Sequence, residues 1–124
     1  MSKCNLLIWG REFSLDISYE CYPDEKVLDI QREALESIST EQNVISETQL
    51  KIEEYILSDE KANVAGSVDN IFKYVMPKCV FIPRSKDTRC VVIMCDYIFD
   101  PEHGIAIVFE NEHLKIIGTQ DVIL

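Results

Sequence analysis

The segment from Arg89 to Phe99 constrains the fold most, because its residues are apolar on both alternating sides. One side carries Val91, Ile93, Cys95, Tyr97 and Phe99, and the other carries Cys90, Val92, Met94 and Ile98. After Arg89, Asp96 is the only charged residue in the run. A β-strand that is buried on both faces has this pattern. The segment therefore predicts a central strand, with the other elements as its sheet partners or as layers packed on the sheet.

Further strands are predicted on both sides of this central strand. The turn-like segment 100–104 separates it from an apolar run at 105–111, and a second turn leads into a strand within 112–121. Before it, the polar segment 84–88 follows a short apolar run at 78–83. Strands joined by such short connections are typical of an antiparallel meander.

The amino-terminal part predicts a β-hairpin. Residues 4–9 form an apolar run, residues 10–12 supply a turn, and residues 13–21 alternate strictly between apolar and polar side chains. Strict alternation indicates a strand with one buried and one solvent-exposed face. Trp9, the only tryptophan, is expected in the core of this hairpin rather than at the surface as a binding anchor.

The hydrophobic period changes to that of a helix after the hairpin. Residues 27–38 carry an apolar stripe, and a second stripe begins near Asn43 or at Ser46 and extends to about Leu57. The short connection between them favours an antiparallel helical hairpin. A short third helix is predicted after Ser67 as its cap, and Pro77 should end it.

Strands, then helices, then strands is the order of a segregated α+β fold. We predict a single α+β domain over residues 1–124, with about six strands in a largely antiparallel sheet. The sheet combines the amino-terminal hairpin with the carboxyl-terminal meander, and two or three helices lie between them in sequence and pack on one face. The hairpin either continues the meander or crosses to its other edge, and the sequence leaves both arrangements open.

Composition restricts the compartment and the cofactors. No apolar run is long enough to span a bilayer, and the apolar stretch near the amino terminus is too short for a signal peptide, which predicts a soluble cytoplasmic protein. The five cysteines are odd in number and lack CxxC spacing, and four of them lie in apolar strand-like segments. We expect them to be small buried hydrophobic residues in a reducing compartment and not a disulfide framework. No cofactor is predicted, because the four glycines are isolated and form no phosphate-binding loop.

The negative charge is concentrated in one part of the chain. Residues 12–60 hold 14 acidic and three basic residues, a net charge of −11, and the remainder is close to neutral. Such a surface repels nucleic acid and anionic membranes and speeds the encounter with a basic partner, although acidity can also serve solubility alone. The outer faces of the predicted helices supply the candidate partner-binding residues Glu33, Glu36, Glu47, Glu53 and Glu54.

One polar cluster has the residue types of a metal site or a general base. Asp96, Asp100, Glu102 and His103 bring carboxylates close to an imidazole in sequence. An Asp-Pro pair followed by Gly104 is also typical of a tight turn, and no second histidine or cysteine lies at ligand spacing. We favour the structural turn, and a metal-dependent enzyme that uses these four residues remains an alternative.

The carboxyl-terminal string FDPEHGIAIVFENEHLKIIGTQD resembles the closing signature of a bacterial domain family of unknown function. The matching positions are Asp100, Glu102, His103, Gly104, Val108, Phe109, Asn111, Leu114, Ile117, Gly118, Gln120 and Asp121. Residues 29–35 also look like the helix that follows the first hairpin in such proteins. The resemblance implies no enzymatic activity. Small acidic domains of this kind are often encoded near polymorphic toxins, so it implies an immunity protein that binds one cognate toxin domain.

The function that we predict is therefore an immunity-type inhibitor. It would bind a cognate toxin domain, basic and possibly a nuclease, and mask it by charge complementarity without chemistry of its own. A small intracellular scaffold or sensor module is the alternative of a different class, and it would bind several partners weakly instead of one tightly.

Overall fold

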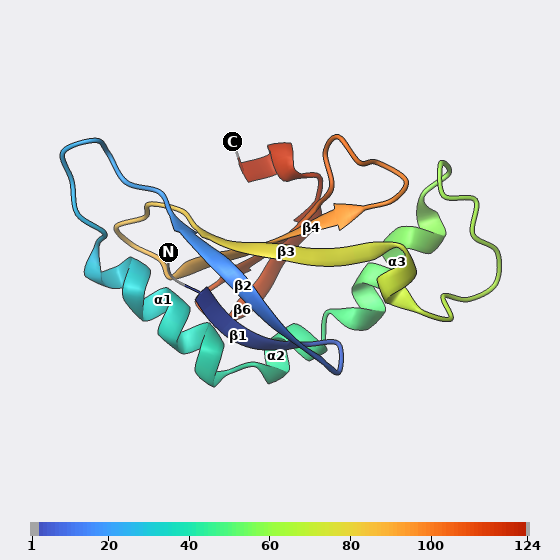
Figure 1. The fold of residues 1–124 in the computed structure, drawn as a ribbon, viewed down its shortest axis with the longest axis horizontal. Coiled ribbons are helices and arrows are strands. Elements are labelled where there is room, and N and C mark those ends of the chain that lie inside the picture. Colours follow the sequence, from blue (N-terminus) through green and yellow to red (C-terminus); the bar gives the residue numbers. More distant parts are fainter. Residues whose placement is uncertain (1–2, 124) are drawn as a thin grey trace.

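The computed structural model describes residues 3–123, with side chains through Asp121, and shows one sheet with helices against it (Figure 1). The strands are β1 (Lys3–Ile8), β2 (Arg11–Tyr19), β3 (Val75–Ile82), β4 (Cys90–Tyr97), β5 (Ile105–Glu110) and β6 (His113–Gly118). The helices are α1 (Asp29–Thr40), α2 (Asn43–Ser46) and α3 (Gln49–Ser58), with 3₁₀ turns η1 (Ile71–Lys73) and η2 (Gln120–Ile123).

The six strands lie in the order β1-β2-β3-β4-β5-β6. All neighbouring pairs are antiparallel except β2 and β3, which run parallel from Asp16 beside Cys79 to Tyr19 beside Ile82. A parallel connection needs a crossover, and the helices supply it here. The predicted α+β class and mostly antiparallel sheet are confirmed. The amino-terminal hairpin continues the meander at β3, which decides between the two arrangements that the sequence left open.

The three helices pack on one face of the sheet. Their buried side chains, among them Ala34, Ile38 and Ile52, belong to the same core cluster as Ile93 of β4 and Phe109 of β5. A smaller apolar cluster of Val92, Ala106 and Val108, with Phe81, Cys90 and Met94 beside it, occupies the opposite face. The side of β4 toward the helices is buried as predicted, but on the opposite side only Val92 is buried, and Ile98, just beyond the strand, is exposed.

The hairpin between β1 and β2 turns at Trp9 and Gly10, one residue earlier than the predicted turn. Both residues have positive φ, 51° for Trp9 and 82° for Gly10. Trp9 is buried, and its Nε1 donates a hydrogen bond to Thr48 Oγ1 at 2.9 Å, while the Thr48 hydroxyl donates to the Ile45 carbonyl at 2.6 Å. The prediction of a core tryptophan is confirmed, and the ring joins the hairpin to the link between α2 and α3.

The second predicted helix and its pairing with the first both differ from the prediction. The second predicted helix is broken at residues 47–48 into α2 and α3. Figure 1 shows α1, α2 and α3 following one another along the sheet, so α1 and α3 do not form the predicted antiparallel hairpin.

No helix of residues 3–123 has the length and apolar character that a membrane span requires.

The third predicted helix is reduced to the single turn η1. Asn70, not Ser67, caps this turn, and its side chain accepts a hydrogen bond from the Phe72 amide at 3.1 Å. β3 begins at Val75, before Pro77 instead of after it. The physical reason is that a residue preceding proline avoids the helical region, so Met76 is already extended.

The buried side chain of Gln31 joins α1 to the ends of the parallel strands. Its Nε2 donates to the carbonyl oxygens of Glu20 at 2.9 Å and Ile82 at 3.1 Å. Its Oε1 accepts from the Leu28 amide at 2.9 Å, which satisfies one of the free amides at the start of the helix. One amide group therefore fixes where the crossover begins relative to β2 and β3.

Candidate functional site

The outer face of α1 carries the first candidate residues. Ala34 and Ile38 point into the core, so helical periodicity places Glu33, Glu36 and Thr40 on other sides of the helix. Both glutamates are exposed, as predicted. The Thr40 hydroxyl donates to the Glu36 carbonyl at 3.0 Å, which leaves the Glu36 carboxylate available to the surface.

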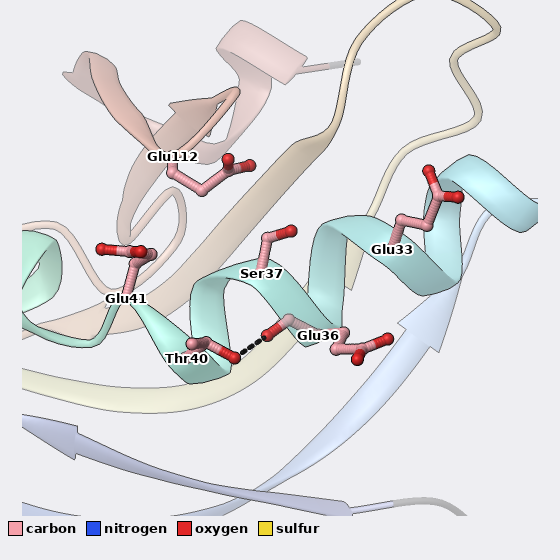
Figure 2. A pocket seen from close by; sticks show the side chains of 6 residues that line it. All are labelled: Glu33, Glu36, Ser37, Thr40, Glu41 and Glu112. Atoms are coloured by element: carbon pink, nitrogen blue, oxygen red, sulfur yellow. Dashed lines mark hydrogen bonds between the residues drawn. The ribbon is translucent and has the colours of Figure 1, made fainter.

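Four glutamates gather around one depression of about 250 Å³ beside α1. Figure 2 shows Glu33, Glu36 and Glu41 on α1 and its carboxyl-terminal end, with Glu112 above them from the turn between β5 and β6. Ser37 and Thr40 supply hydroxyl groups to the same depression. We call these six residues the acidic depression.

Glu112 is held in place by a constrained turn and an ion pair. Asn111 and Glu112 both have positive φ, 49° and 64°, which is the geometry of a two-residue hairpin turn. The Asn111 side chain accepts from the Arg89 amide at 3.1 Å. Arg89 binds the Glu112 carboxylate through two hydrogen bonds, at 2.8 Å from Nε and 2.9 Å from Nη2, and this pairing raises the pKa of Arg89. Glu112 is therefore charge-compensated.

The other three carboxylates of the depression have no such hydrogen-bonded partner, although the charge of Glu33 also acts on Arg89. Among residues 3–121, Glu33, Glu36 and Glu41 form no ion pair. The last turn of α1 has no basic residue, and Glu41 lies at its carboxyl-terminal cap. A negative charge there opposes the helix dipole and typically costs about 0.3–1 kcal/mol. Carboxylates in this arrangement accept hydrogen bonds from lysine or arginine side chains of another molecule.

Of the three remaining predicted residues, Glu47 and Glu54 line neighbouring depressions and Glu53 does not. Glu47, in the link between α2 and α3, lines a second depression that also contains Glu112. Glu54, on α3, lines a third depression next to β6. Glu53 is half-buried and accepts a hydrogen bond from Gln49 Nε2 at 3.3 Å, so the expectation that it is fully exposed was wrong.

Sequence reasoning missed Glu41 and Glu112. Glu41 has a detectable signal, because it follows Glu33 at a spacing of about two helical turns on the same side. The apolar stripes, however, place it in the gap between the two predicted helices. Glu112 has no local signal, because only the order of the strands brings the β5–β6 turn next to α1.

The side chains of Asp96, Asp100, Glu102 and His103 do not come together in one site. Asp96 faces Lys78, with 3.5 Å between Oδ2 and Nζ, while Asp100 caps the turn between β4 and β5. The Asp100 carboxylate accepts from the His103 amide at 3.3 Å and lies 3.1 Å from the His103 Nδ1. In the described part of the chain, no three His, Cys, Asp or Glu residues are placed to hold a metal ion. Asp100 and His103 form a structural turn.

We expect His103 to titrate above its ordinary value, since the hydrogen bond and charge of Asp100 raise its pKa. A raised folded-state pKa adds stability below about pH 6.5 that is lost as pH rises through the folded pKa. NMR titration of a His113→Asn variant, which leaves one imidazole, measures this directly. Adding Asp100→Asn should lower the midpoint, and a midpoint that does not change would show that Asp100 is not the cause.

Comparisons with known proteins place the chain in one family. A family model with the description "Domain of unknown function (DUF6985)" matches residues 2–124. Neither the curated proteins nor the solved structures contain a match.

Proposed function

The chain belongs to the DUF6985 family, and because the family's description assigns no activity, we propose its function from the surface of α1. The protein binds a basic protein domain through the acidic depression and its continuation along α2 and α3. In the form that we propose, the partner is a cognate bacterial toxin domain, for which a nuclease is one candidate class. The protein neutralises the toxin by covering it and carries out no chemistry itself.

One observation supports this proposal above the others. Glu33, Glu36 and Glu41 surround a single depression without an ion-pair partner among residues 3–121, although the end of α1 disfavours negative charge. A protein that needs acidity only for solubility gains nothing by concentrating it there. A basic partner would relieve the repulsion and use the same charges to speed association.

Co-purification tests the proposed function. The protein is expressed together with basic toxin domains encoded by neighbouring genes, and complexes are isolated through a tag on the toxin. One tight partner, whose toxicity the protein suppresses, is the expected result. Several weak partners would favour the scaffold or sensor alternative, and no partner among such domains would contradict the immunity role.

Charge reversal should slow association with that partner at least about tenfold, since steering accounts for roughly 10- to 1000-fold in such pairs. The variant Glu33→Lys/Glu36→Lys/Glu41→Lys is compared with Glu60→Lys/Asp69→Lys/Glu102→Lys, which changes the net charge equally at exposed positions outside the depression. Stopped-flow kinetics should show a large loss only for the first variant. Salt of about 0.5 M should abolish most of the difference. Equal losses in both variants would mean that total charge, not this surface, attracts the partner.

A further inference from the structure

The acidic depression is one end of a longer groove. Glu112 lines both the first and the second depression, and Lys51 and Leu114 line both the second and the third. One wall is formed by the helices in succession, and the other by the β5–β6 turn and β6. We call these three adjoining depressions together the edge groove.

The strand that forms one wall of the edge groove is at the border of the sheet. β6 pairs only with β5, and among the described residues its backbone makes no other hydrogen bond. An edge strand presents unpaired amide and carbonyl groups along its outer side. Its single lysine, Lys115, is engaged by Glu110 at 2.9 Å and has no partner in β5, because it forms a bulge that divides the regular edge into residues 113–114 and 116–118.

The two ends of the edge groove differ in chemistry. The end at α1 has the carboxylates of Glu33, Glu36 and Glu41, which form no ion pair among residues 3–121. The part along β6 has the partly buried apolar side chains Leu114 and Ile117 beside Tyr55. A segment that fills the groove therefore needs apolar side chains along β6 and positive charge at the end next to α1.

We propose that the edge groove binds an extended segment of the basic partner, which pairs with β6 as a seventh strand. Its backbone hydrogen bonds to β6, its apolar side chains cover Leu114 and Ile117, and its lysine or arginine side chains reach the acidic depression. The inference rests on the proposed function only in that the partner is basic. A second copy of this chain is disfavoured as the occupant, because each copy has a net charge of −10.

A synthetic peptide tests this docking mode without the toxin. The probe is a labelled peptide about ten residues long, with alternating valine and threonine to pair with the six-residue strand and consecutive lysines at one end to reach the acidic depression. The control has the same sequence with N-methyl groups on alternate residues, which keeps the charge but removes hydrogen-bond donors from one edge. Binding is followed by fluorescence anisotropy, and the bound region by amide hydrogen exchange.

We expect slower exchange at residues 113–118, affinity at least about tenfold weaker for the methylated peptide, and a similar loss in the Glu33→Lys/Glu36→Lys/Glu41→Lys variant. Equal affinity for the two peptides, protection at β1 instead of β6, or no binding at millimolar peptide would each overturn strand addition. Protection of β6 without peptide, together with dimers in sedimentation, would assign the groove to a second copy and also overturn it. None of these outcomes contradicts a toxin complex found by co-purification, so the two failures are distinguishable.

Discussion

Gly104→Ala should lower the free energy of unfolding by about 4 kcal/mol, because overpacking costs roughly 1–3 kcal/mol and a left-handed backbone another 1–2. Gly104 has a φ of 61° and is buried at the start of β5. A Cβ there would collide with the carbonyl oxygen of Cys95 and would lie 2.6 Å from Gln120 Nε2. Because the Cys95 oxygen belongs to the backbone of β4, it cannot move without disturbing the centre of the sheet.

Gly66→Ala is the matched control for this variant. Gly66 also has a positive φ, 84°, but a Cβ built there meets no atom within 4 Å. It should therefore lose only the backbone component, about 1–2 kcal/mol. Urea unfolding of both variants separates strain from collision. A Gly104→Ala variant no less stable than Gly66→Ala would show that the packing around the turn gives way easily.

The close packing around Gly104 also explains the presence of particular residues in the turn before it and in the carboxyl-terminal segment. Gln120 Nε2 donates to the Cys95 carbonyl at 3.1 Å, and the Gln120 amide donates to the His103 carbonyl at 3.0 Å. Asp100 holds the His103 side of the same turn. The contacts of Gln120 with the turn and with β4 therefore hold η2 against the sheet, and they require a residue as small as Gly104. This structural role explains four of the twelve motif positions, namely Asp100, His103, Gly104 and Gln120.

The strands and the first helix were predictable because their signals are local. The period of two in residues 13–19 and the two-sided apolar run of β4 depend only on neighbouring side chains, and both became strands. Glu33 and Glu36 were predictable for the same reason, since the helical period puts them outside the core. The predicted boundaries near Pro77 were wrong, because Met76 precedes a proline and therefore prefers extended backbone.

Features that depend on distant contacts could not be read from the chain. The break between α2 and α3 occurs where Thr48 accepts a hydrogen bond from the buried Trp9. No local sequence pattern predicts this contact, because the two residues are 39 positions apart. Glu112 joins the acidic depression only because β6 lies at the border of the sheet, with its turn beside α1. The parallel pairing of β2 with β3 likewise depends on long-range geometry, to which Gln31 contributes.

Gln31→Glu tests that contribution, and it should lower the free energy of unfolding by about 4 kcal/mol at pH 7. The substitution preserves shape, and one carboxylate oxygen can still accept from the Leu28 amide. The other would replace a donor and face the carbonyl oxygens of Glu20 and Ile82. Gln31→Met, which loses the same hydrogen bonds without adding a charge, should cost about 3 kcal/mol.

The pH dependence of the two variants gives the decisive comparison. Burial against two carbonyl oxygens raises the pKa of a carboxyl at position 31, so its protonated form is favoured in the folded state. The stability of Gln31→Glu relative to wild type should therefore be highest below the ordinary glutamate pKa and fall as pH rises through the raised folded value. Near pH 4.5 the protonated group can donate to one carbonyl, and Gln31→Glu should become more stable than Gln31→Met. If chemical unfolding at both pH values gave the two variants the same order, the Gln31 side chain would not be the donor that joins α1 to the parallel strands.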